Sequence, residues 1–539
     1  MAGWNYADLW ESIAEAVPER PAQVHGPRTL GWRDFDRRAD ALARHLLDAG
    51  LQRQSKVAAY LYNGPEYLET YYAAFKAGLA PVNTNYRYVA DELVYLFDNA
   101  DAEAVVFHAS FAPTVERIRG QLPKVRTWIA LGEAGHPVPP FAADYDVLIA
   151  REGPRTQALW GRSGDDVLIL YTGGTTGMPK GVMWRQDDLF NVLGGGGNLL
   201  MDIPPLSTIG EAGERARAAD PGAMIAAAPL MHGTAQFTAM MTLTTGGTVA
   251  CLPSKHFDAN EFWNEAERLK ASGAAIVGMA FAAPLLEALE RNPGRWDLSA
   301  LRRLGSSGTV WSMENKQGLL RHLPDCVIFD SFGSSEAVGM GASTSSTGAM
   351  AETAKFMVGV NSAVFTEDGR RVEPGSGERG LVAVSGFLPV GYYKDPEKTA
   401  RTFREFEGRR WSVPGDFATV EADGSLKLLG RGSQVVNTGG EKVFPEEVEE
   451  ALKRYPGVRD VAVVGVPDAR FGERICAVVD FAGPAAPSLA DLSAHVREHL
   501  AGYKAPRELV LAPITRAPNG KLDYKSVRAL ALERLGLSQ

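Results

Sequence analysis

Hydrophobic residues in the first part of the chain recur with two alternating periods. From Asp34 to Gly50 they return at helical spacing, which predicts an amphipathic helix. The nearly unbroken apolar run from Lys56 to Tyr62 then predicts a buried strand. The same alternation continues through a helix over 65–78 and strands over 104–107 and 166–171. An α/β fold built in stacked layers follows from this pattern.

The pattern changes at two later points. Residues 194–223 are rich in Gly, Ala and Pro, which predicts a mobile surface loop without regular elements. After Arg431 a compact βαβ pattern begins, with helices expected from Pro445 and over 489–500 and strands over 460–466 and 475–481. We therefore expect a large multi-layer N-terminal α/β domain over 1–430. A small α+β C-terminal domain over 431–539 should be attached to it by a hinge.

Length, charge and cysteine content narrow the class of protein. A chain of 539 residues is too long for one hydrophobic core, and 45% apolar with 22% charged residues is ordinary globular usage. The net charge of -9 argues against a nucleic-acid partner. Three scattered cysteines show neither a disulfide framework nor metal-ligand spacing, and no signal peptide or membrane-spanning run is present in the sequence. We expect a cytoplasmic protein without an integral membrane segment, and leave peripheral membrane contact open.

A glycine-rich run, Tyr171-Thr-Gly-Gly-Thr-Thr-Gly-Met-Pro-Lys180, carries the first functional signal. Backbone N–H groups with little side-chain bulk form an anion-binding concavity, and the hydroxyls and the lysine suit a phosphate. Pro179 directly precedes Lys180, so the run differs from the Gly-Lys-Ser/Thr loop of other nucleotide-binding proteins. The alternative is a flexible turn between two elements.

This run resembles the phosphate loop of the adenylate-forming, or AMP-binding, superfamily, which includes acyl-CoA synthetases, luciferases and the adenylation domains of peptide synthetases. Further segments resemble the motifs of that superfamily in the same order along nearly the whole chain. They are Pro229–Gly233, Asp330–Glu336, Trp411–Asp416, Gly430-Arg431, Gly439–Glu449 and Pro518–Lys521. The resemblance implies that the chain activates a carboxylic acid with ATP.

The resemblance also implies a role for each matching residue. The phosphates of ATP would be held by Thr172, Gly173, Gly174, Thr175, Thr176 and Lys180, and Mg²⁺ by Glu336 and Thr175. The adenine would be enclosed by Ser307 and Gly308 of the turn Gly305–Thr309 and by Asp330, Ser331, Phe332, Gly333 and Ser335. Asp416 and Arg431 would contact the ribose, His232 would border the acyl group, and Lys521 would bridge the carboxylate and the α-phosphate. Gly439, Gly440 and Lys442 would lie on the CoA side.

Without the resemblance, the same residues have plainer interpretations. Glu336 in a Gly/Ser loop and Lys521 in a Pro-Asn-Gly turn are typical of solvated surface charges. Asp416 follows Pro-Gly as a turn aspartate would, and Arg431 would be an exposed arginine near a linker. His232 would be a packed core histidine.

Two features point to a branch of the superfamily. The segment Thr234–Thr242 lacks the aspartate that would hold the ammonium of an amino acid, which argues against a peptide-synthetase domain. The string from Asn437 to Val448 resembles bacterial fatty-acyl and steroid-side-chain CoA ligases, although Ser433 and Asn437 depart from common residues of the hinge region. An apolar acid is expected, with Phe237, Met240 and Met340 as candidates for its pocket.

The expected protein is an ATP-dependent carboxylic acid:CoA ligase that forms an acyl-AMP and then an acyl-CoA. Its substrates would be a fatty or sterol-side-chain acid, ATP and CoA, with Mg²⁺ as cofactor. A luciferase-like adenylating oxygenase, an aryl-acid CoA ligase and a non-catalytic ATP sensor are the alternatives. The residues leave the oligomeric state open between a monomer and a homodimer.

Overall fold

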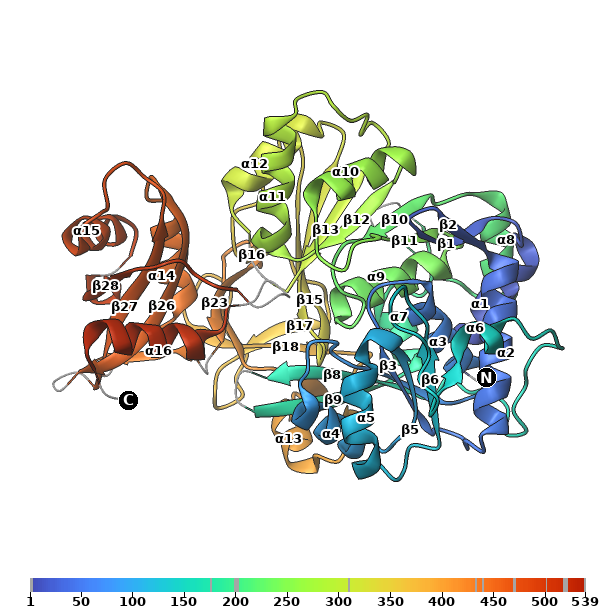
Figure 1. Ribbon diagram of the computed structural model, residues 1–539. Coiled ribbons are helices and arrows are strands. Elements are labelled where there is room, and N and C mark those ends of the chain that lie inside the picture. Colours follow the sequence, from blue (N-terminus) through green and yellow to red (C-terminus); the bar gives the residue numbers. More distant parts are fainter. Residues whose placement is uncertain are drawn as a thin grey trace.

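The chain folds into a large body and a smaller C-terminal unit (Figure 1). The computed structural model describes residues 3–174, 177–197, 203–308, 311–431, 434–438, 441–468, 472–500, 502–516 and 522–537. Among these residues the strands form four sheets, three built before Gly432 and one built after it. The expected α/β class and the large-and-small arrangement are therefore confirmed. The boundary at 430/431 stays a prediction.

The first sheet is parallel at its centre and antiparallel at both edges. In spatial order its strands are β15 (Ala337–Ser345), β14 (Val327–Ser334), β13 (Arg303–Ser307), β12 (Gly273–Ile276), β10 (Ala223–Ala226), β11 (Thr248–Cys251), β1 (Pro21–His25) and β2 (Arg28–Gly31). The strands from β14 to β1 are parallel, and β15 and β2 are antiparallel to their neighbours. The carboxyl ends of the central strands therefore meet at one edge.

The second sheet has the same mixed character. Its order is β19 (Gly391–Tyr392), β9 (Gly177–Arg185), β8 (Val167–Gly174), β4 (Ala80–Asn83), β3 (Lys56–Tyr60), β5 (Ala102–His108), β6 (Thr127–Leu131) and β7 (Ala143–Asp144). The strands from β8 to β7 are parallel, and β9 and β19 add antiparallel pairs at one edge. The predicted strands over 56–62, 104–107 and 166–171 are β3, β5 and β8.

The third and fourth sheets are smaller, and they differ in strand direction: the fourth contains a parallel pair. The third is antiparallel, in the order β16 (Lys355–Phe356), β23 (Leu426–Arg431), β22 (Asp416–Val420), β18 (Arg379–Ser385), β21 (Arg409–Ser412) and β20 (Phe403–Phe406), with β17 (Ser362–Phe365) also on β18. The fourth runs β25 (Glu441–Val443), β24 (Val436–Thr438), β27 (Gly472–Phe481) and β26 (Val458–Asp468), with β28 (Glu508–Leu511) parallel to β27. The β27–α15–β28 connection is the βαβ unit expected from the sequence.

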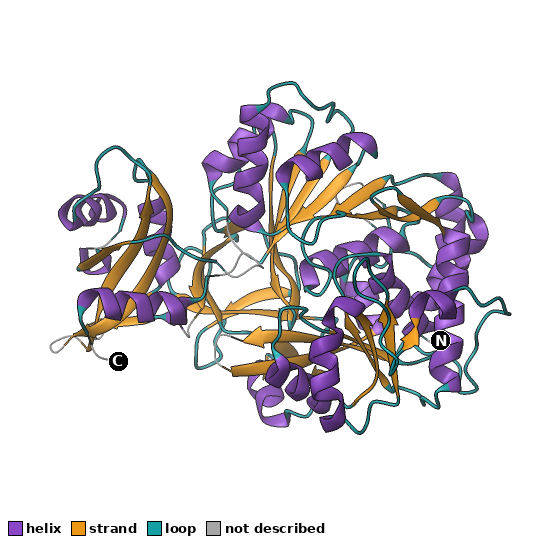
Figure 2. Cartoon of the chain, in the orientation of Figure 1, coloured by secondary structure: helices purple, strands orange, loops and turns teal. Residues whose placement is uncertain are grey.

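Helices cover the sheets on several sides, as Figure 2 shows by colour. In the large body they are α1 (Tyr6–Ala16), α2 (Trp32–Asp48), α3 (Pro65–Lys76), α4 (Ala90–Asn99), α5 (Ala112–Ile118), α6 (Tyr145–Ile149), α7 (Gln186–Val192), α8 (Ile209–Ala218), α9 (Gly233–Thr244), α10 (Ala259–Arg268), α11 (Gly278–Arg291), α12 (Met313–His322) and α13 (Pro396–Thr402). The C-terminal unit holds α14 (Pro445–Lys453), α15 (Leu489–His499) and α16 (Tyr524–Leu535), and short 3₁₀ turns lie at Ala109–Phe111, Arg119–Gln121 and Gly502–Lys504. The helices expected over 34–50, 65–78 and 489–500 are α2, α3 and α15.

Helix α3 lies between the first two sheets and is buried on all sides. It contacts β3 and β4 of the second sheet and β1 of the first, and every one of its residues is buried. Its charged residues are paired: Lys76 Nζ lies 2.6 Å from Glu11 and 2.8 Å from Asp36, and Glu69 accepts from Arg38. Such pairing is required because an isolated charge in a dry core is strongly destabilising.

Helix α8 corrects the prediction of a structureless loop over 194–223. Its N-cap Thr208 accepts from the backbone N–H of Glu211, and the Glu211 carboxylate bonds Ser207 N and Arg215. Gly213 lets the helix approach α1 closely, because an added Cβ would lie 2.6 Å from the Ser12 carbonyl oxygen. The Thr-x-x-Glu capping signal and the Glu–Arg pair one turn apart outweighed the Gly- and Ala-rich composition.

The C-terminal unit contacts the third sheet through a small aromatic contact. The rings of Phe444, which precedes α14, and Phe417 of β22 lie 5.3 Å apart, and Arg379 of β18 lies over the Phe444 ring. At Gly430, φ is +114° and an added Cβ would overlap the Glu446 carboxylate at 2.0 Å. Glycine is therefore required where β23 meets the start of α14.

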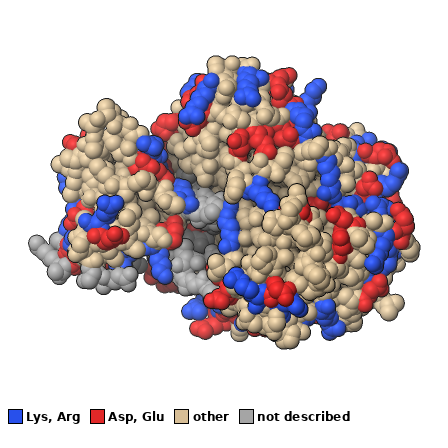
Figure 3. Space-filling model, viewed as in Figure 1, with Lys and Arg blue, Asp and Glu red and all other residues tan. Residues whose placement is uncertain are grey.

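Charged side chains are interspersed over the face shown in Figure 3, with Lys and Arg next to Asp and Glu on both the large body and the C-terminal unit. The helices of the described residues include none with the length and apolarity needed to cross a membrane. Cys251, Cys326 and Cys476 are buried free thiols, and burial raises the pKa of each to about 12. They are therefore unreactive thiols of the core.

Candidate active site

The glycine-rich run forms the end of a β-hairpin at the edge of the second sheet. Strand β8 continues through Gly174 and β9 starts at Gly177, with Thr172 opposite Lys180 and Gly174 opposite Gly177. The described residues of the run, 171–174 and 177–180, are therefore strand rather than a flexible turn, and Thr175 and Thr176 between them lie outside the described residues. Gly181 of the same hairpin packs under Tyr171, where a Cβ would lie 2.7 Å from the ring.

Lys180 has a carboxylate partner on the neighbouring segment. Its Nζ lies 2.9 Å from Asp395, the N-cap of α13, and this contact raises the pKa of Lys180 and lowers that of Asp395. Both side chains are partly exposed, so the pair is accessible to solvent. An incoming phosphate would compete with Asp395 for the lysine.

Two asparagines that the sequence pattern did not single out hold the segment before α9 against the second sheet. Asn83 donates to the carbonyls of Tyr171 and Met231, at 2.9 and 2.7 Å, and accepts from Tyr171 N. Asn63 bonds Ala226 and Ala228 in the same way. Because Met231 directly precedes His232, these bonds place the predicted acyl-site histidine, the N-cap of α9, beside the start of the glycine hairpin. Each asparagine ends or follows a buried strand, which is the signal that sequence reasoning could have used.

Strands β13 and β14 bring the predicted adenine-site residues together. Ser307 is the register partner of Ser331, and Ser306 is that of Asp330. Gly305 to Ser307 belong to β13, so the expected glycine-rich turn is there a strand, which ends just before Gly308, where φ is +90°. Phe332 follows on β14 and packs on Phe356, with ring centroids 5.3 Å apart. These residues share the carboxyl edge of the first sheet with His232.

Asp330 is buried and paired rather than open to a ligand on both oxygens. Its Oδ2 accepts from Lys316 Nζ at 3.0 Å and from Trp311 Nε1 at 3.1 Å. Burial raises the pKa of Asp330, and the Lys316 ammonium and the Trp311 bond oppose that rise. Lys316 and Trp311 lie on or next to α12, and the sequence offered no sign of their link to the Asp330 motif.

Glu336 lies in the turn between β14 and β15, half-buried, and its position is set by two other segments. The Tyr392 hydroxyl donates to its Oε1 at 2.6 Å, and the Ser412 hydroxyl donates to its backbone carbonyl. Trp184 Nε1 donates to the carbonyl of the preceding Ser335. A fixed carboxylate with its second oxygen unused by these bonds fits Mg²⁺, which takes few protein oxygens and completes its shell with phosphate and water. Tyr392 was missed because it lies 56 residues from Glu336 in sequence.

Asp416 and Arg431, predicted separately as ribose contacts, are direct neighbours. Asp416 begins β22, Arg431 ends β23, and the two are register partners on these antiparallel strands. Asp416 is buried. Antiparallel pairing of two consecutive strands thus brings together two residues that belong to separate sequence motifs.

The remaining predicted residues divide into two groups. Thr175, Thr176, Gly439, Gly440 and Lys521 lie outside the described residues, as does Ser433, and the side chains of Arg431 and Lys442 are likewise not described. Among the pocket candidates, Phe237 and Met240 pack in the large core, whereas Met340 packs in a cluster with Val364 and Val382 of the third sheet. The structure therefore does not gather these three side chains in one cluster.

Comparison with known protein families identifies the family of this chain. The AMP-binding enzyme pattern matches residues 10–393, and the pattern of the AMP-binding enzyme C-terminal domain matches residues 447–521. The chain belongs to the AMP-binding enzyme family. The first match includes the glycine-rich run, Pro229–Gly233 and Asp330–Glu336, and the second includes Pro518–Lys521, so the resemblance to this family is confirmed.

Relatives of this AMP-binding enzyme extend over its whole length. It is 40% identical over 537 residues to a medium/long-chain-fatty-acid–CoA/3-oxocholest-4-en-26-oate–CoA ligase of Mycolicibacterium smegmatis, covering 98% of this chain and 97% of that one. It is 41% identical over 537 residues to a 3-oxocholest-4-en-26-oate–CoA ligase of Rhodococcus rhodochrous, covering 97% and 95%. ATP-bound MatB from Rhodopseudomonas palustris superposes with a TM-score of 0.80 at 25% identity, covering 98% and 99%. An anthranilate CoA ligase with anthranoyl-AMP has the same fold, with a TM-score of 0.84 at 21% identity over 100% and 99%.

Proposed function

We propose that the chain is an AMP-forming acid–CoA ligase that acts on an apolar fatty or steroid-side-chain acid. The observation that carries this proposal is the full-length identity of about 40% to acid–CoA ligases of that class. Hydrogen bonds between distant segments also support it: Asn83 links Tyr171 of the glycine hairpin to Met231 beside His232, and Glu336 is bonded to Tyr392 and Ser412.

In the first half-reaction the carboxylate of the acid attacks the α-phosphorus of ATP, and pyrophosphate leaves as the acyl-adenylate forms. The backbone of Gly173 and Gly174 and the Lys180 ammonium would hold the phosphates, Asp416 the ribose hydroxyls, and the β13–β14 edge the adenine. Glu336 and Thr175 would hold Mg²⁺, which neutralises polyphosphate charge when bound. Lys521 would hydrogen-bond the charge that develops between carboxylate and phosphate.

In the second half-reaction the thiol of CoA attacks the acyl carbon, and AMP leaves as the thioester forms. For this step we propose that the C-terminal unit over 431–539 rotates about 431–433. That rotation would withdraw Lys521 and bring Gly439, Gly440 and Lys442 to the site. Among the described residues the two units meet where the start of α14 lies against β22 and β23, and separating this contact would allow such a motion.

An apolar acid is supported by the helix that follows His232. Helix α9 carries no acidic or basic residue in either its first or its last turn, and Phe237 and Met240 are buried in it. An ammonium or a second carboxylate beside this helix would lose water without gaining a partner. We therefore expect neutral, hydrophobic acids to be preferred over amino acids and dicarboxylates.

A release assay for AMP tests the proposal. Purified chain with ATP and Mg²⁺ is given fatty acids of graded length, a sterol-side-chain acid, an aromatic acid and an amino acid, each with and without CoA. We expect CoA-dependent AMP release with the fatty and sterol-side-chain acids and thioester as product. Oxygen consumption without CoA would instead support an adenylating oxygenase, and turnover restricted to the aromatic acid would overturn the substrate class.

A further inference from the structure

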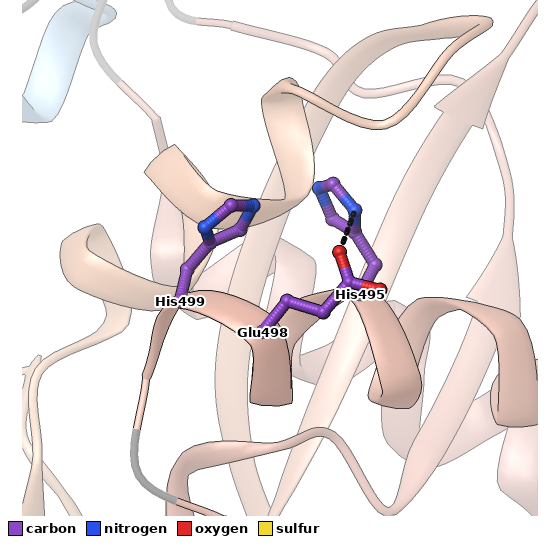
Figure 4. A group of neighbouring side chains, drawn as sticks. All are labelled: His495, Glu498 and His499. Atoms are coloured by element: carbon purple, nitrogen blue, oxygen red, sulfur yellow. Dashed lines mark ion pairs between the residues drawn. The ribbon is translucent and has the colours of Figure 1, made fainter.

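Helix α15 carries three potential metal ligands on one side of its last two turns. They are His495, Glu498 and His499, shown in Figure 4, and one ligand atom from each lies within 4.8 Å of the other two. Two histidines four residues apart project from the same face of a helix, the spacing that zinc-binding helices use. Among the described residues, these three form a group of His, Cys, Asp or Glu side chains whose ligand atoms lie close enough together to hold one metal ion.

The first histidine is already oriented by a bond on its far side. His495 Nε2 lies 3.0 Å from the carbonyl oxygen of Ala451 in the last turn of α14. A carbonyl can only accept, so Nε2 carries the hydrogen and Nδ1 is the nitrogen left to bind an ion. The Tyr455 ring, 5.4 Å from the imidazole, packs against it edge-on. Ligating histidines are commonly held by such a bond from the second nitrogen to a backbone carbonyl.

The other two ligands can move to complete a coordination shell. His495 Nδ1 lies 4.0 Å from Glu498 Oε2, and the two imidazole rings lie 5.1 Å apart. Ligand atoms around a tetrahedral Zn²⁺ lie about 3.3 Å apart, given bonds of about 2.0–2.1 Å. Glu498 and His499 are exposed, so rotation of their side chains can close this difference without moving the helix.

We propose that His495, Glu498 and His499 bind a divalent transition-metal ion, with Zn²⁺ as the expected ion. Two imidazoles and one carboxylate suit Zn²⁺, Ni²⁺ or Cu²⁺, whereas Mg²⁺ and Ca²⁺ prefer oxygen-only sites. Three protein ligands leave the fourth position to water. The site lies on α15 of the C-terminal unit, away from β8 and β9 of the glycine hairpin (Figure 1), and is independent of the proposed function.

The bound ion would join two helices of the C-terminal unit. Metal binding at Nδ1 polarises the imidazole and strengthens the donation from Nε2–H to Ala451, which links α15 to α14. It would also hold the last turn of α15, where His499 is the final helical residue. Added Zn²⁺ should therefore raise the unfolding temperature of the C-terminal unit.

Calorimetric titration of the full-length, nucleotide-free chain with ZnCl₂ tests the site. His499→Ala and Glu498→Gln remove exposed ligands without disturbing the His495–Ala451 bond, and His322→Ala, in the last turn of α12, is the matched control. We expect the wild type and the control to bind Zn²⁺ alike. His499→Ala should weaken this binding by about tenfold or more and remove the Zn²⁺-induced rise in unfolding temperature.

Co²⁺ provides a second readout that does not depend on heat or stability. Bound at two imidazoles and a carboxylate, it should give a visible d–d absorption band in the wild type and the control, and the band should be lost in His499→Ala. Equal Zn²⁺ binding by the wild type and His499→Ala would overturn the proposal, as would absence of Zn²⁺ uptake by the wild type at micromolar concentrations.

Discussion

Two buried carboxylates, one in the large body and one in the C-terminal unit, are compensated in different ways. Asp330 accepts directly from a buried ammonium, Lys316, and from Trp311. Glu449 of α14 instead accepts from the Tyr524 hydroxyl and from Val463 N, while the nearby Lys453 donates to Glu450. Burial raises the pKa of both, and that of Glu449 to about 7. The large body thus holds its site carboxylate by a direct ion pair, and the C-terminal unit contains a carboxyl group that titrates near neutral pH.

This difference matches the proposed roles of the two regions. The ATP side of the site depends on bonds between segments far apart in sequence, such as Tyr392 to Glu336 and Asn83 to Met231. The C-terminal unit has its own core, and it contacts the third sheet through Phe444 and Glu446. A rigid site and a separately folded, movable unit are what alternation between two half-reactions requires.

The largest expected effect separates the two half-reactions. Lys521→Ala should lower acid-dependent pyrophosphate exchange by about 1,000-fold, the upper range for loss of one preorganised donor. Conversion of supplied acyl-adenylate to acyl-CoA should be retained, because Lys521 is proposed to act only before the rotation. Both rates are measured on the same preparation, and Lys525→Ala on α16 is the control. Equal loss of both half-reactions would contradict the assignment.

A large effect on stability should follow from breaking the buried pair in the large body. Lys316→Met leaves Asp330 buried without its ammonium partner and should destabilise the chain by about 3–5 kcal/mol. Urea unfolding followed by tryptophan fluorescence measures it. Lys124→Met, which removes exposed pairs with Asp98 and Asp101, should change stability by less than about 1 kcal/mol. Similar values for the two variants would refute the importance of the buried pair.

Stability of the C-terminal unit should fall as pH rises toward neutrality. Folding raises the pKa of Glu449 from its ordinary value of 4.5 to about 7, so the folded state binds this proton more tightly than the unfolded state. The resulting stabilisation is complete below about pH 4.5 and is lost as pH rises through about 7, a change of roughly 3 kcal/mol. Glu449→Gln should flatten this dependence. Hydrogen exchange of the α14 and β26 amides between pH 5 and 8 measures this pH dependence of stability. If stability depended on pH in the same way in Glu449→Gln, Glu449 would not be the cause.

The smallest effect concerns the orientation of Glu336. Tyr392→Phe removes the hydroxyl that donates to its carboxylate and should lower kcat for adenylation about tenfold. The Mg²⁺ concentration needed for half-maximal rate should rise, whereas a merely structural role would leave it unchanged. Tyr393→Phe, whose hydroxyl bonds Asp101 instead, is the matched control. An unaltered Mg²⁺ dependence in Tyr392→Phe would exclude this positioning role.

The hydrophobic pattern along the sequence predicted several helices and strands correctly. Helices α2 and α3 and strand β3 were predicted because periodicity and length point to the same element. Helix α8 was missed because composition was given more weight than its capping signal. The glycine run resembles a phosphate loop in sequence, but its described residues pair between β8 and β9 within the sheet.

The sequence by itself determined the residue types that the chemistry needs and the family to which the chain belongs, because the order and spacing of the motifs can be read directly along the chain. Only the tertiary structure decided that Asp416 faces Arg431, that Lys316 neutralises Asp330 and that Tyr392 orients Glu336. These contacts join residues that different strands and helices bring together. Local propensity cannot encode them, since strand order and register are set by burial of the whole sheet.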